Sequence, residues 1–324
     1  MRLRSSDLRP ASVFAGRLER IKSEAVRLIA YPILLETCSP FDAGETNGAC
    51  LDGGDGRRQQ MLMHDKTVLV TGTASGIGRE TALVCAREGA SRIACLDIHD
   101  ANNEATAHEL EQMGVEVLAL HVDLGEVDHI RAAFHRVAAE WDRLDASAHI
   151  GGYSWRGETL DVTVEQWDLV LNANLRGTFF CCQEALRMMY PRGNGAIVNM
   201  SADAAFYPIY GFALQAAGKG GIVNMTRTLA LEAAPRGVRV NAVSPGIVST
   251  QKAGYVRPDQ PAPRRENPPP AEAVTRLGEQ TAAGRYMTMA EIADTFTFLC
   301  SDRASGINGD LVFVNGGGYP TLDY

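Results

Sequence analysis

The segment Thr71-Gly72-Thr73-Ala74-Ser75-Gly76-Ile77-Gly78 decides how this chain folds. An apolar run, 67–71, leads into it, and a pattern typical of a helix, 78–88, follows it. A glycine-rich turn between a buried strand and a helix is typical of an open α/β sheet, because the glycines allow a tight turn and close packing of helix on strand. The folded domain is therefore expected to begin shortly before this turn, at about residue 61.

Short apolar runs alternate with helical patterns along the rest of the chain. Helices are expected at 78–88, 103–113 and 127–141, and strands at 67–71, 92–97, 115–122, 146–150, 196–200, 239–243 and 311–314. Near-continuous apolar strands separated by helices indicate a parallel sheet that is covered on both faces. We therefore predict an α/β fold with a doubly wound parallel sheet, formed by a single domain over residues 61–324.

Two segments do not follow this pattern. Residues 1–60 combine scattered arginines with a loop rich in Gly and Asp. Three interpretations of this extension stay open: an artefact of an upstream start codon, which we prefer, a poorly ordered tail, or an accessory segment. The proline-rich stretch 257–270 cannot form a packed element, so a lid loop is expected at about 251–285.

Composition limits the classes of function. The net charge of −8 argues against a nucleic-acid surface, because phosphate binding needs a basic patch. The seven cysteines include no C-x-x-C pair and no Cys/His cluster, which favours reduced thiols in a cytoplasmic protein and argues against a metal site. The apolar stretch 28–35 is too short to cross a bilayer. We expect a cytoplasmic protein with no nucleic-acid, metal or membrane partner.

The glycine-rich turn also predicts a ligand. Backbone N–H groups at the start of a helix bind a pyrophosphate when no side chain blocks its approach. A dinucleotide is therefore expected at five residues of the turn: Gly72, Ser75, Gly76, Ile77 and Gly78.

Asp97 indicates which dinucleotide this is. It closes the second predicted strand 19 residues after Gly78, where an acid can bind ribose hydroxyls and would repel a 2′-phosphate. No Lys or Arg precedes Gly76 in the turn to attract such a phosphate. NAD(H) is therefore expected in preference to NADP(H). The alternative is that Asp97 is only a helix cap or a loop acid.

Three later segments resemble, in their order along the chain, those of the short-chain dehydrogenase/reductase family. They are Asn172-Ala-Asn174-Leu-Arg-Gly177, Asn241-Ala-Val-Ser-Pro245-Gly246-Ile-Val-Ser-Thr250 and Ile307-Asn-Gly-Asp-Leu-Val-Phe-Val-Asn-Gly316-Gly317. The resemblance covers residues 66–318 and implies a Rossmann fold, a nicotinamide cofactor and an oxidoreductase.

The same resemblance implies further cofactor contacts. Asp123 would touch the adenine edge, Gly151 would let the backbone approach the cofactor, and Lys219 would bind ribose hydroxyls. Pro245 and Gly246 would flank the nicotinamide, and Thr250 would bind its carboxamide or a phosphate.

The catalytic positions depart from the family pattern. An Asn, a Ser, a Tyr and a Lys form the family's proton relay, and Asn174 and Lys219 match two of them. Gln215 stands where the tyrosine of Tyr-x-x-x-Lys is expected, and an amide has no titratable proton near neutral pH. The serine position falls on Ala202, so Ser201 would serve only after a shift of one residue, although neighbouring side chains of an extended chain point oppositely.

Two residues are candidate substitutes for the missing acid. Tyr210 lies in the loop that borders the substrate pocket in this family. His149, which replaces a family asparagine, has an intrinsic pKa of about 6.5. The alternative is that Tyr210 packs its loop and that His149 hydrogen-bonds locally.

Three functions stay open. We prefer an NAD(H)-dependent oxidoreductase that acts on a carbonyl, alcohol or enone through a non-standard proton donor. The alternatives are a non-redox enzyme of the same fold (a cyclase, isomerase or dehydratase) and an inactive NAD(H)-binding relative. A hydrophobic small-molecule substrate is expected. Helices at 163–190 and 215–233 resemble those of the family's dimer interfaces, which implies a homodimer or homotetramer.

Overall fold

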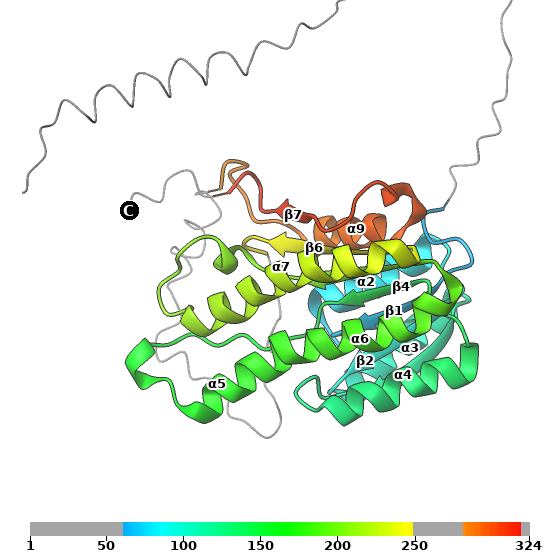
Figure 1. The fold of residues 1–324 in the computed structure, drawn as a ribbon, viewed down its shortest axis with the longest axis horizontal. Helices are drawn as coiled ribbons and strands as arrows, with labels where there is room; N and C mark the ends of the chain where they lie inside the picture. Colours follow the sequence, from blue (N-terminus) through cyan, green and yellow to red (C-terminus); the bar gives the residue numbers. More distant parts are fainter. Residues whose placement is uncertain (1–60, 249–280, 319–324) are drawn as a thin grey trace, which may run out of the picture. The chain divides into compact units, whose positions relative to one another are not determined.

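The computed structural model describes residues 61–248 and 281–318 (Figure 1). The predicted extension at 1–60 lies outside these residues, as do Thr250 and most of the predicted lid. What was expected of those segments stays a prediction.

Seven strands form one parallel sheet in the order β3-β2-β1-β4-β5-β6-β7. The strands are β1 (Thr67–Thr71), β2 (Arg92–Asp97), β3 (Glu116–His121), β4 (Ala146–His149), β5 (Gly195–Met200), β6 (Val238–Pro245) and β7 (Leu311–Val314). The chain adds β2 and β3 on one side of β1 and then places β4 on the other side. This order confirms the doubly wound parallel sheet, with its switch point between β1 and β4.

Helices cover the sheet on both faces, and Figure 1 shows α6 and α7 crossing in front of the strands. The α-helices are α2 (Gly76–Arg87), α3 (Asp100–Gln112), α4 (Val127–Trp141), α5 (Val164–Leu171), α6 (Gly177–Met189), α7 (Ala213–Ala233) and α9 (Met289–Cys300). Short helical turns are η1 (Thr159–Asp161), η2 (Asn172–Arg176), η3 (Tyr190–Arg192), η4 (Asp203–Ala205), η5 (Ala234–Arg236) and η6 (Asp302–Ala304).

The long helix predicted over 163–190 is present from Val164 to Met189, but its α-helical geometry is interrupted once. A π-helical turn, η2, separates α5 from α6, so that Gly177 N donates to Asn172 O, five residues earlier. The Asn174 side chain donates from Nδ2 to Val170 O (2.9 Å) and to Tyr153 O (2.6 Å). Such turns occur often at functional sites, because they change the direction of one side chain within a helix.

The core lies on both faces of the sheet. Val68 and Val70 pack in a cluster with Phe296 of α9, whereas Leu69, between them, packs in a second cluster with Phe134 of α4. Full burial of a side chain of this size stabilises the fold by about 1.5–3 kcal/mol. Alternate strand residues therefore hold α2 and α9 on one face and α4, α6 and α7 on the other.

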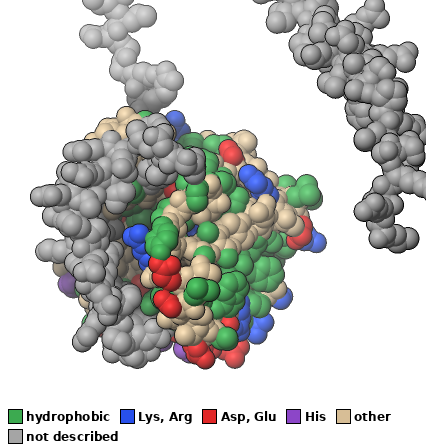
Figure 2. Space-filling model, turned by 90° about the vertical axis from the view of Figure 1, so that its left-hand side faces the viewer, with side chains coloured by type: hydrophobic (Ala, Val, Ile, Leu, Met, Phe, Trp, Pro, Cys, Tyr) green, Lys and Arg blue, Asp and Glu red, His purple; other side chains and the backbone are tan. Residues whose placement is uncertain are grey.

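Apolar side chains also reach the surface. Figure 2 looks onto the end of the molecule where α5 and the loop before α7 lie, and it shows apolar side chains spread among acidic and basic ones. Leu160, Val164, Trp167, Ile209 and Tyr210 are exposed. These residues give α5 and the loop before α7 an apolar surface outside the core.

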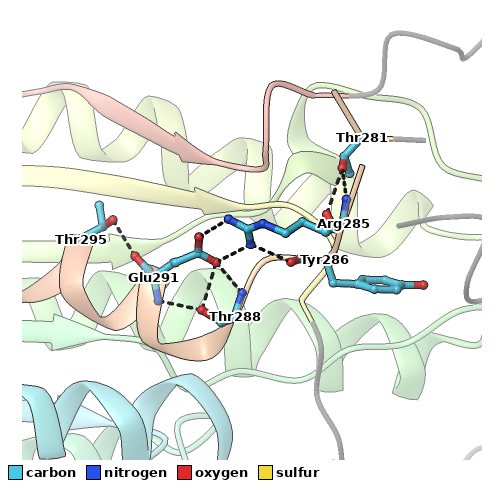
Figure 3. Close-up of polar contacts among 6 residues, drawn as sticks. All are labelled: Thr281, Arg285, Tyr286, Thr288, Glu291 and Thr295. Carbon is cyan, nitrogen blue, oxygen red and sulfur yellow. Dashed lines mark hydrogen bonds and ion pairs between the residues drawn. The ribbon is translucent and has the colours of Figure 1, made fainter. Parts of the chain in front are cut away.

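The start of α9 is fixed by polar contacts (Figure 3). Thr288 is the N-cap, and its Oγ1 accepts from Glu291 N (3.2 Å) while Thr288 N donates to the Glu291 carboxylate (2.8 Å). Arg285 binds the same carboxylate (2.6 Å), and this contact is the main reason that the pKa of Glu291 is lowered to about 2. The capping box therefore sets where α9 begins.

Thr288→Ala should lower the free energy of unfolding by about 1 kcal/mol, because it removes the hydroxyl that caps α9. Thr295→Ala is the matched control, since Thr295 Oγ1 only donates to Glu291 O inside the same helix (Figure 3). Urea denaturation should show no loss for Thr295→Ala. Equal losses for the two variants would mean that the cap does not determine the stability of α9.

Candidate active site

A cavity of about 270 Å³ opens at the carboxyl ends of β1, β2, β4 and β5. This is the switch point of the sheet, where ligands of open α/β folds bind. The lining comes from the predicted turn, from the ends of β2 and β5, from the segments that follow β2, β3 and β4, and from η2. The residues are Gly72, Ala74, Ser75, Ile77, Gly78, Leu96, Asp97, Ile98, His99, Val122, Asp123, Leu124, Ile150, Gly151, Gly152, Tyr153, Ala173 and Met200.

Glycines are required in the turn between β1 and α2. A methyl group on Gly78 would overlap the carbonyl oxygen of Gly72, and one on Gly72 would lie 2.8 Å from the Cα atom of Gly151. Gly72 also has φ +80°, a conformation that other residues rarely adopt. The turn therefore brings the N-terminus of α2 against the backbone that follows β4.

The start of α2 is available to an anion. Ser75 is the N-cap, no side chain caps the helix, and no acid stands in its first turn. The helix N–H groups and the helix dipole both favour a negative charge there. Of the five residues predicted to bind a pyrophosphate, Gly72, Ser75, Ile77 and Gly78 line the cavity, whereas Gly76 begins α2 without lining it.

Asp97 lines the cavity and also holds the turn. Its Oδ2 accepts from Ala74 N (3.0 Å) and its Oδ1 from His99 N (2.9 Å). A carboxylate oxygen has two lone pairs, so each one retains capacity for a ribose hydroxyl. The geometry is compatible with both interpretations of Asp97, as a loop acid and as a ribose ligand.

The other predicted cofactor residues lie around the same end of the sheet. Asp123 and Gly151 line the cavity, and Gly151 N donates to Thr71 Oγ1 (2.9 Å). Pro245 ends β6, and Gly246 N donates to Val314 O (3.1 Å), so the last two strands position both residues. Neither residue lines the cavity.

Lys219 and Asn174 meet beside Gly152. Lys219 is 5% exposed, and its Nζ donates to Met200 O (2.9 Å). Asn174 is 1% exposed, and its Oδ1 has no hydrogen-bond partner. A Cβ atom on Gly152 would overlap Asn174 Oδ1 and lie 3.9 Å from Lys219 Nζ. Gly152 and Met200 line the cavity, so these two polar atoms lie behind its wall, although Lys219 and Asn174 are not themselves lining residues.

Gln215 lies one helical turn before Lys219 on α7. Its side chain is 9% exposed, and its Oε1 also lacks a hydrogen-bond partner. Residues four apart on a helix share one face, so Gln215 and Lys219 are neighbours. Ser201 Oγ donates to Lys219 O (3.1 Å), so this hydroxyl is used to fix α7 and does not line the cavity.

His149 lies in the core and not at the cavity. Its ring bonds Ser147 Oγ (2.8 Å) through Nε2 and Asn199 Oδ1 (2.8 Å) through Nδ1, and Cys182 Sγ lies 3.5 Å from Nδ1. Burial lowers the pKa of His149 to about 4. The physical reason is strand alternation: Ala148 packs with the α2 and α9 cluster, so His149 points toward α6 and α7. This placement gives no support to His149 as the proton donor.

Tyr210 is 72% exposed, and its hydroxyl hydrogen-bonds the carboxylate of Glu158. It does not line the cavity either. Tyr153 does line the cavity, and its carbonyl accepts from Asn174. Its position directly after the glycines that follow β4 indicates from the sequence that its loop faces the pocket, although it was given no role among the site residues.

The polar groups present suit a nicotinamide dinucleotide. The bare helix start, the glycine contacts that admit backbone approach, and Asp97 match its pyrophosphate and ribose. The unpartnered oxygens of Asn174 and Gln215 need hydrogen-bond donors, which water or ligand hydroxyls supply. Across residues 61–248 and 281–318, no group of three His, Cys, Asp or Glu residues is placed to hold a metal, and no helix is long and apolar enough to cross a membrane.

Stability should fall as the pH is lowered through the titration range of His149. The folded-state pKa of about 4 lies below the unfolded value of about 6.5, so the stabilising contribution is complete above pH 6.5 and is lost toward pH 4. Between these two limits the contribution of His149 to the free energy of unfolding changes by about 3 kcal/mol. Urea denaturation at pH 7.5, 6 and 5 should show a smaller loss for His149→Gln than for the wild type. Identical pH dependence of the two proteins would contradict this explanation.

Comparison with known proteins agrees with the geometry. The family described as Enoyl-(Acyl carrier protein) reductase matches residues 72–318. The 3-oxoacyl-[acyl-carrier-protein] reductase FabG of Thermotoga maritima is 33% identical over 257 residues, 79% of this chain and 99% of that protein. The D-threitol dehydrogenase of Mycolicibacterium smegmatis is 35% identical over 252 residues, 78% of this chain and 92% of that protein.

A solved structure described as a short-chain alcohol dehydrogenase of Sinorhizobium meliloti has the same fold. It superposes with a TM-score of 0.72 at 29% identity and covers 80% of this chain and 98% of its own. The relatives are reductases and dehydrogenases, and they match over nearly their whole length. The chain belongs to the short-chain dehydrogenase/reductase family and is an oxidoreductase.

Proposed function

We propose that this oxidoreductase uses NAD(H) to interconvert a carbonyl or enone and its reduced product, with a proton donor other than the family's tyrosine. One observation carries the proposal. Lys219 Nζ and Asn174 Oδ1 lie together beside Gly152, which lines the same cavity as the bare N-terminus of α2. That arrangement matches a nucleotide whose reacting ring reaches Lys219.

Each part of the cavity has a task in this function. The N–H groups at the start of α2 hold the pyrophosphate, and Lys219 binds hydroxyls of the ribose next to the nicotinamide. When bound, the nicotinamide supplies or accepts the hydride. Asn174 Oδ1 accepts a hydrogen bond from a ligand hydroxyl or water, which removes the cost of about 1–3 kcal/mol for a buried unpaired acceptor.

The preference for NAD(H) rests on Asp97. Its carboxylate faces the cavity, where it favours ribose hydroxyls and disfavours a 2′-phosphate. Among the described residues that line the cavity there is no Lys or Arg to offset that repulsion.

A hydrophobic small molecule is the proposed substrate. Tyr153 and Trp155 come from the loop after β4, and Tyr207 comes from the loop before α7. Gly157 N donates to Gly211 O (3.0 Å), so these two loops are joined at the border of the site. Aromatic side chains there favour an apolar body attached to the reacting carbonyl.

We also propose that the protein self-associates and that it is cytoplasmic. Val164 and Trp167 of α5 and Leu231 of α7 are exposed apolar side chains on the helices expected to form a homodimer or homotetramer. Five cysteines of the described residues are buried as free thiols, which suits a reducing compartment.

A second function is favoured by Gln215. Without a titratable group at this position, the fold would also serve a non-redox enzyme or an inactive NAD(H)-binding relative. These two alternatives require that product forms at an unchanged nicotinamide redox state, or that no product forms at all.

Titration of the full chain with NADH and NADPH, followed by nicotinamide fluorescence, tests the proposal. NADH should bind more tightly, and Asp97→Asn should weaken NADH binding by about 10-fold or more, because a hydrogen bond to a charged group contributes about 1.5–3 kcal/mol. The control is Asp100→Asn, an exposed residue that pairs with His121 and does not line the cavity.

Equal affinity for the two nucleotides would remove the NAD(H) preference. If neither nucleotide binds to a protein whose thermal unfolding is normal, the oxidoreductase mechanism proposed here is wrong.

A further inference from the structure

The source of the proton is the open step of the proposed reaction. When a hydride reaches a carbonyl carbon, the oxygen becomes an alkoxide and must take up a proton. Gln215 has none to give, Ser201 is bonded to the Lys219 carbonyl, and His149 is enclosed in the core. Tyr210 is exposed and bonded to Glu158. Both substitute donors named from the sequence, His149 and Tyr210, are therefore used elsewhere.

Lys219 has the geometry that a donor needs. Its ammonium has three N–H groups, and one of them is bound by Met200 O. Met200 and Gly152, the two residues next to Nζ, line the cavity. The remaining N–H groups of Lys219 are therefore available behind the part of the cavity wall that Gly152 and Met200 form. Asn174 Oδ1, beside Gly152, and Gln215 Oε1, one helical turn earlier on α7, have no hydrogen-bond partner.

The environment also makes this lysine a weaker base than usual. Burial lowers the pKa of Lys219 to about 8, close to neutral, where an acid transfers a proton efficiently. The described ionisable groups at this end of the sheet include Asp97, His99, Asp123 and Tyr153, which line the cavity. Asp203 of η4 accepts from Ser244 and Asn315.

Charged groups on the other elements that pack against α7 are exposed or paired elsewhere. Glu165, Asp168 and Arg176 are exposed, Glu184 pairs with Arg131 and Arg187, Arg236 stacks on Tyr190, and Arg239 donates to carbonyls near η6. The two thiols of α6 that face the core, Cys181 and Cys182, have pKa values raised by burial and stay neutral.

We infer that Lys219 is itself the acid–base residue of the proposed reaction. In reduction, the carbonyl carbon gains the hydride and its C=O π bond breaks, while an N–H bond of the Lys219 ammonium breaks and an O–H bond forms on the alkoxide. The nicotinamide is oxidised, the carbonyl is reduced, and the neutral amine regains its proton from water. In oxidation, the neutral amine takes the hydroxyl proton. This inference rests on the proposed function.

The first test needs no substrate. The chain has four lysines, Lys22, Lys66, Lys219 and Lys252, so NMR of the full chain labelled at lysine Cε gives few signals. Lys219→Met identifies the signal of interest by its loss. A midpoint near pH 8 is expected for this signal, against about 10.4 for an ordinary lysine. A midpoint at or above 10 would overturn the inference.

The second test separates proton transfer from cofactor binding. Lys219→Arg keeps a cation for the ribose, so NADH affinity should stay within about threefold, but a guanidinium does not release its proton. NADH oxidation with ethyl acetoacetate or 2-cyclohexenone as probe should fall by at least about 100-fold. In the wild type the rate of reduction should fall as pH rises through 8, because the ammonium is lost.

Chemical rescue gives the decisive readout. Lys219→Ala should lose the reaction, and added primary amines should restore it at least tenfold, in an order that follows their pKa values. Lys66→Arg is the matched control, because Lys66 pairs with Asp302 and does not line the cavity, so amines should leave its rate unchanged. A positioning lysine would not be replaced by a free amine, so absence of rescue overturns the inference.

The two proposals fail in different ways. If wild type binds no NADH, or never oxidises it with either probe, the proposed function fails. If wild type oxidises NADH and Lys219→Arg is as active as wild type, only the assignment of Lys219 as the acid fails.

Discussion

The close contact between the turn after β1 and the backbone after β4 is the constraint on which the site depends. Gly78 packs on the carbonyl of Gly72, and Gly72 packs on Gly151, with no side chain between the three segments. This contact lets the N-terminus of α2 open directly into the cavity, because nothing larger than hydrogen stands in the way. Asp97 secures the same turn through Ala74 N. The start of α2 and Asp97, which we propose to hold the pyrophosphate and the ribose, are thus positioned by one backbone junction.

The sequence predicted the central strands well because both faces of the sheet are buried there. A continuous apolar run such as 67–71 is typical of a strand buried on both faces, and β1 begins and ends where this run does. Helix α9 was not predicted, although Thr288 and Glu291 carry a capping signal. The break at η2 had no local signal, because it depends on a hydrogen bond from Asn174 to Tyr153, 21 residues earlier in the chain.

The sequence was sufficient to predict which segments border the candidate site, but not where each side chain points. Position along a strand placed Gly151 and Asp97 at the cavity, since the carboxyl ends of parallel strands share one edge. The direction of His149 was open until the register was known, because a shift of one residue moves a side chain to the opposite face. Tyr210 depended on the path of an irregular loop, for which periodicity gives no information.

Polar side chains in the core and polar side chains beside the cavity are arranged in opposite ways. Inside the core, Ser147, His149, Asn199 and Thr226 are connected by hydrogen bonds in an unbroken set. At the cavity, Asn174 and Gln215 each keep an oxygen without a partner. A fully hydrogen-bonded network fixes the packing of a core. A buried acceptor without a protein partner indicates a place where water or a ligand donates the hydrogen bond.

The π-helical turn η2 determines how the path from α5 to α6 responds to the loss of a residue. It accommodates an extra residue within the path from α5 to α6 and thereby directs Asn174 toward Gly152. Loss of one residue would restore a regular α-helix and leave the buried face of α6 in phase with the sheet, because the π-helical turn absorbs the extra residue without changing the register of the helix beyond it. Asn174 would then lose the direction that brings it beside Gly152 and Tyr153. A deletion here is therefore expected to preserve the fold of the segment and to change the site.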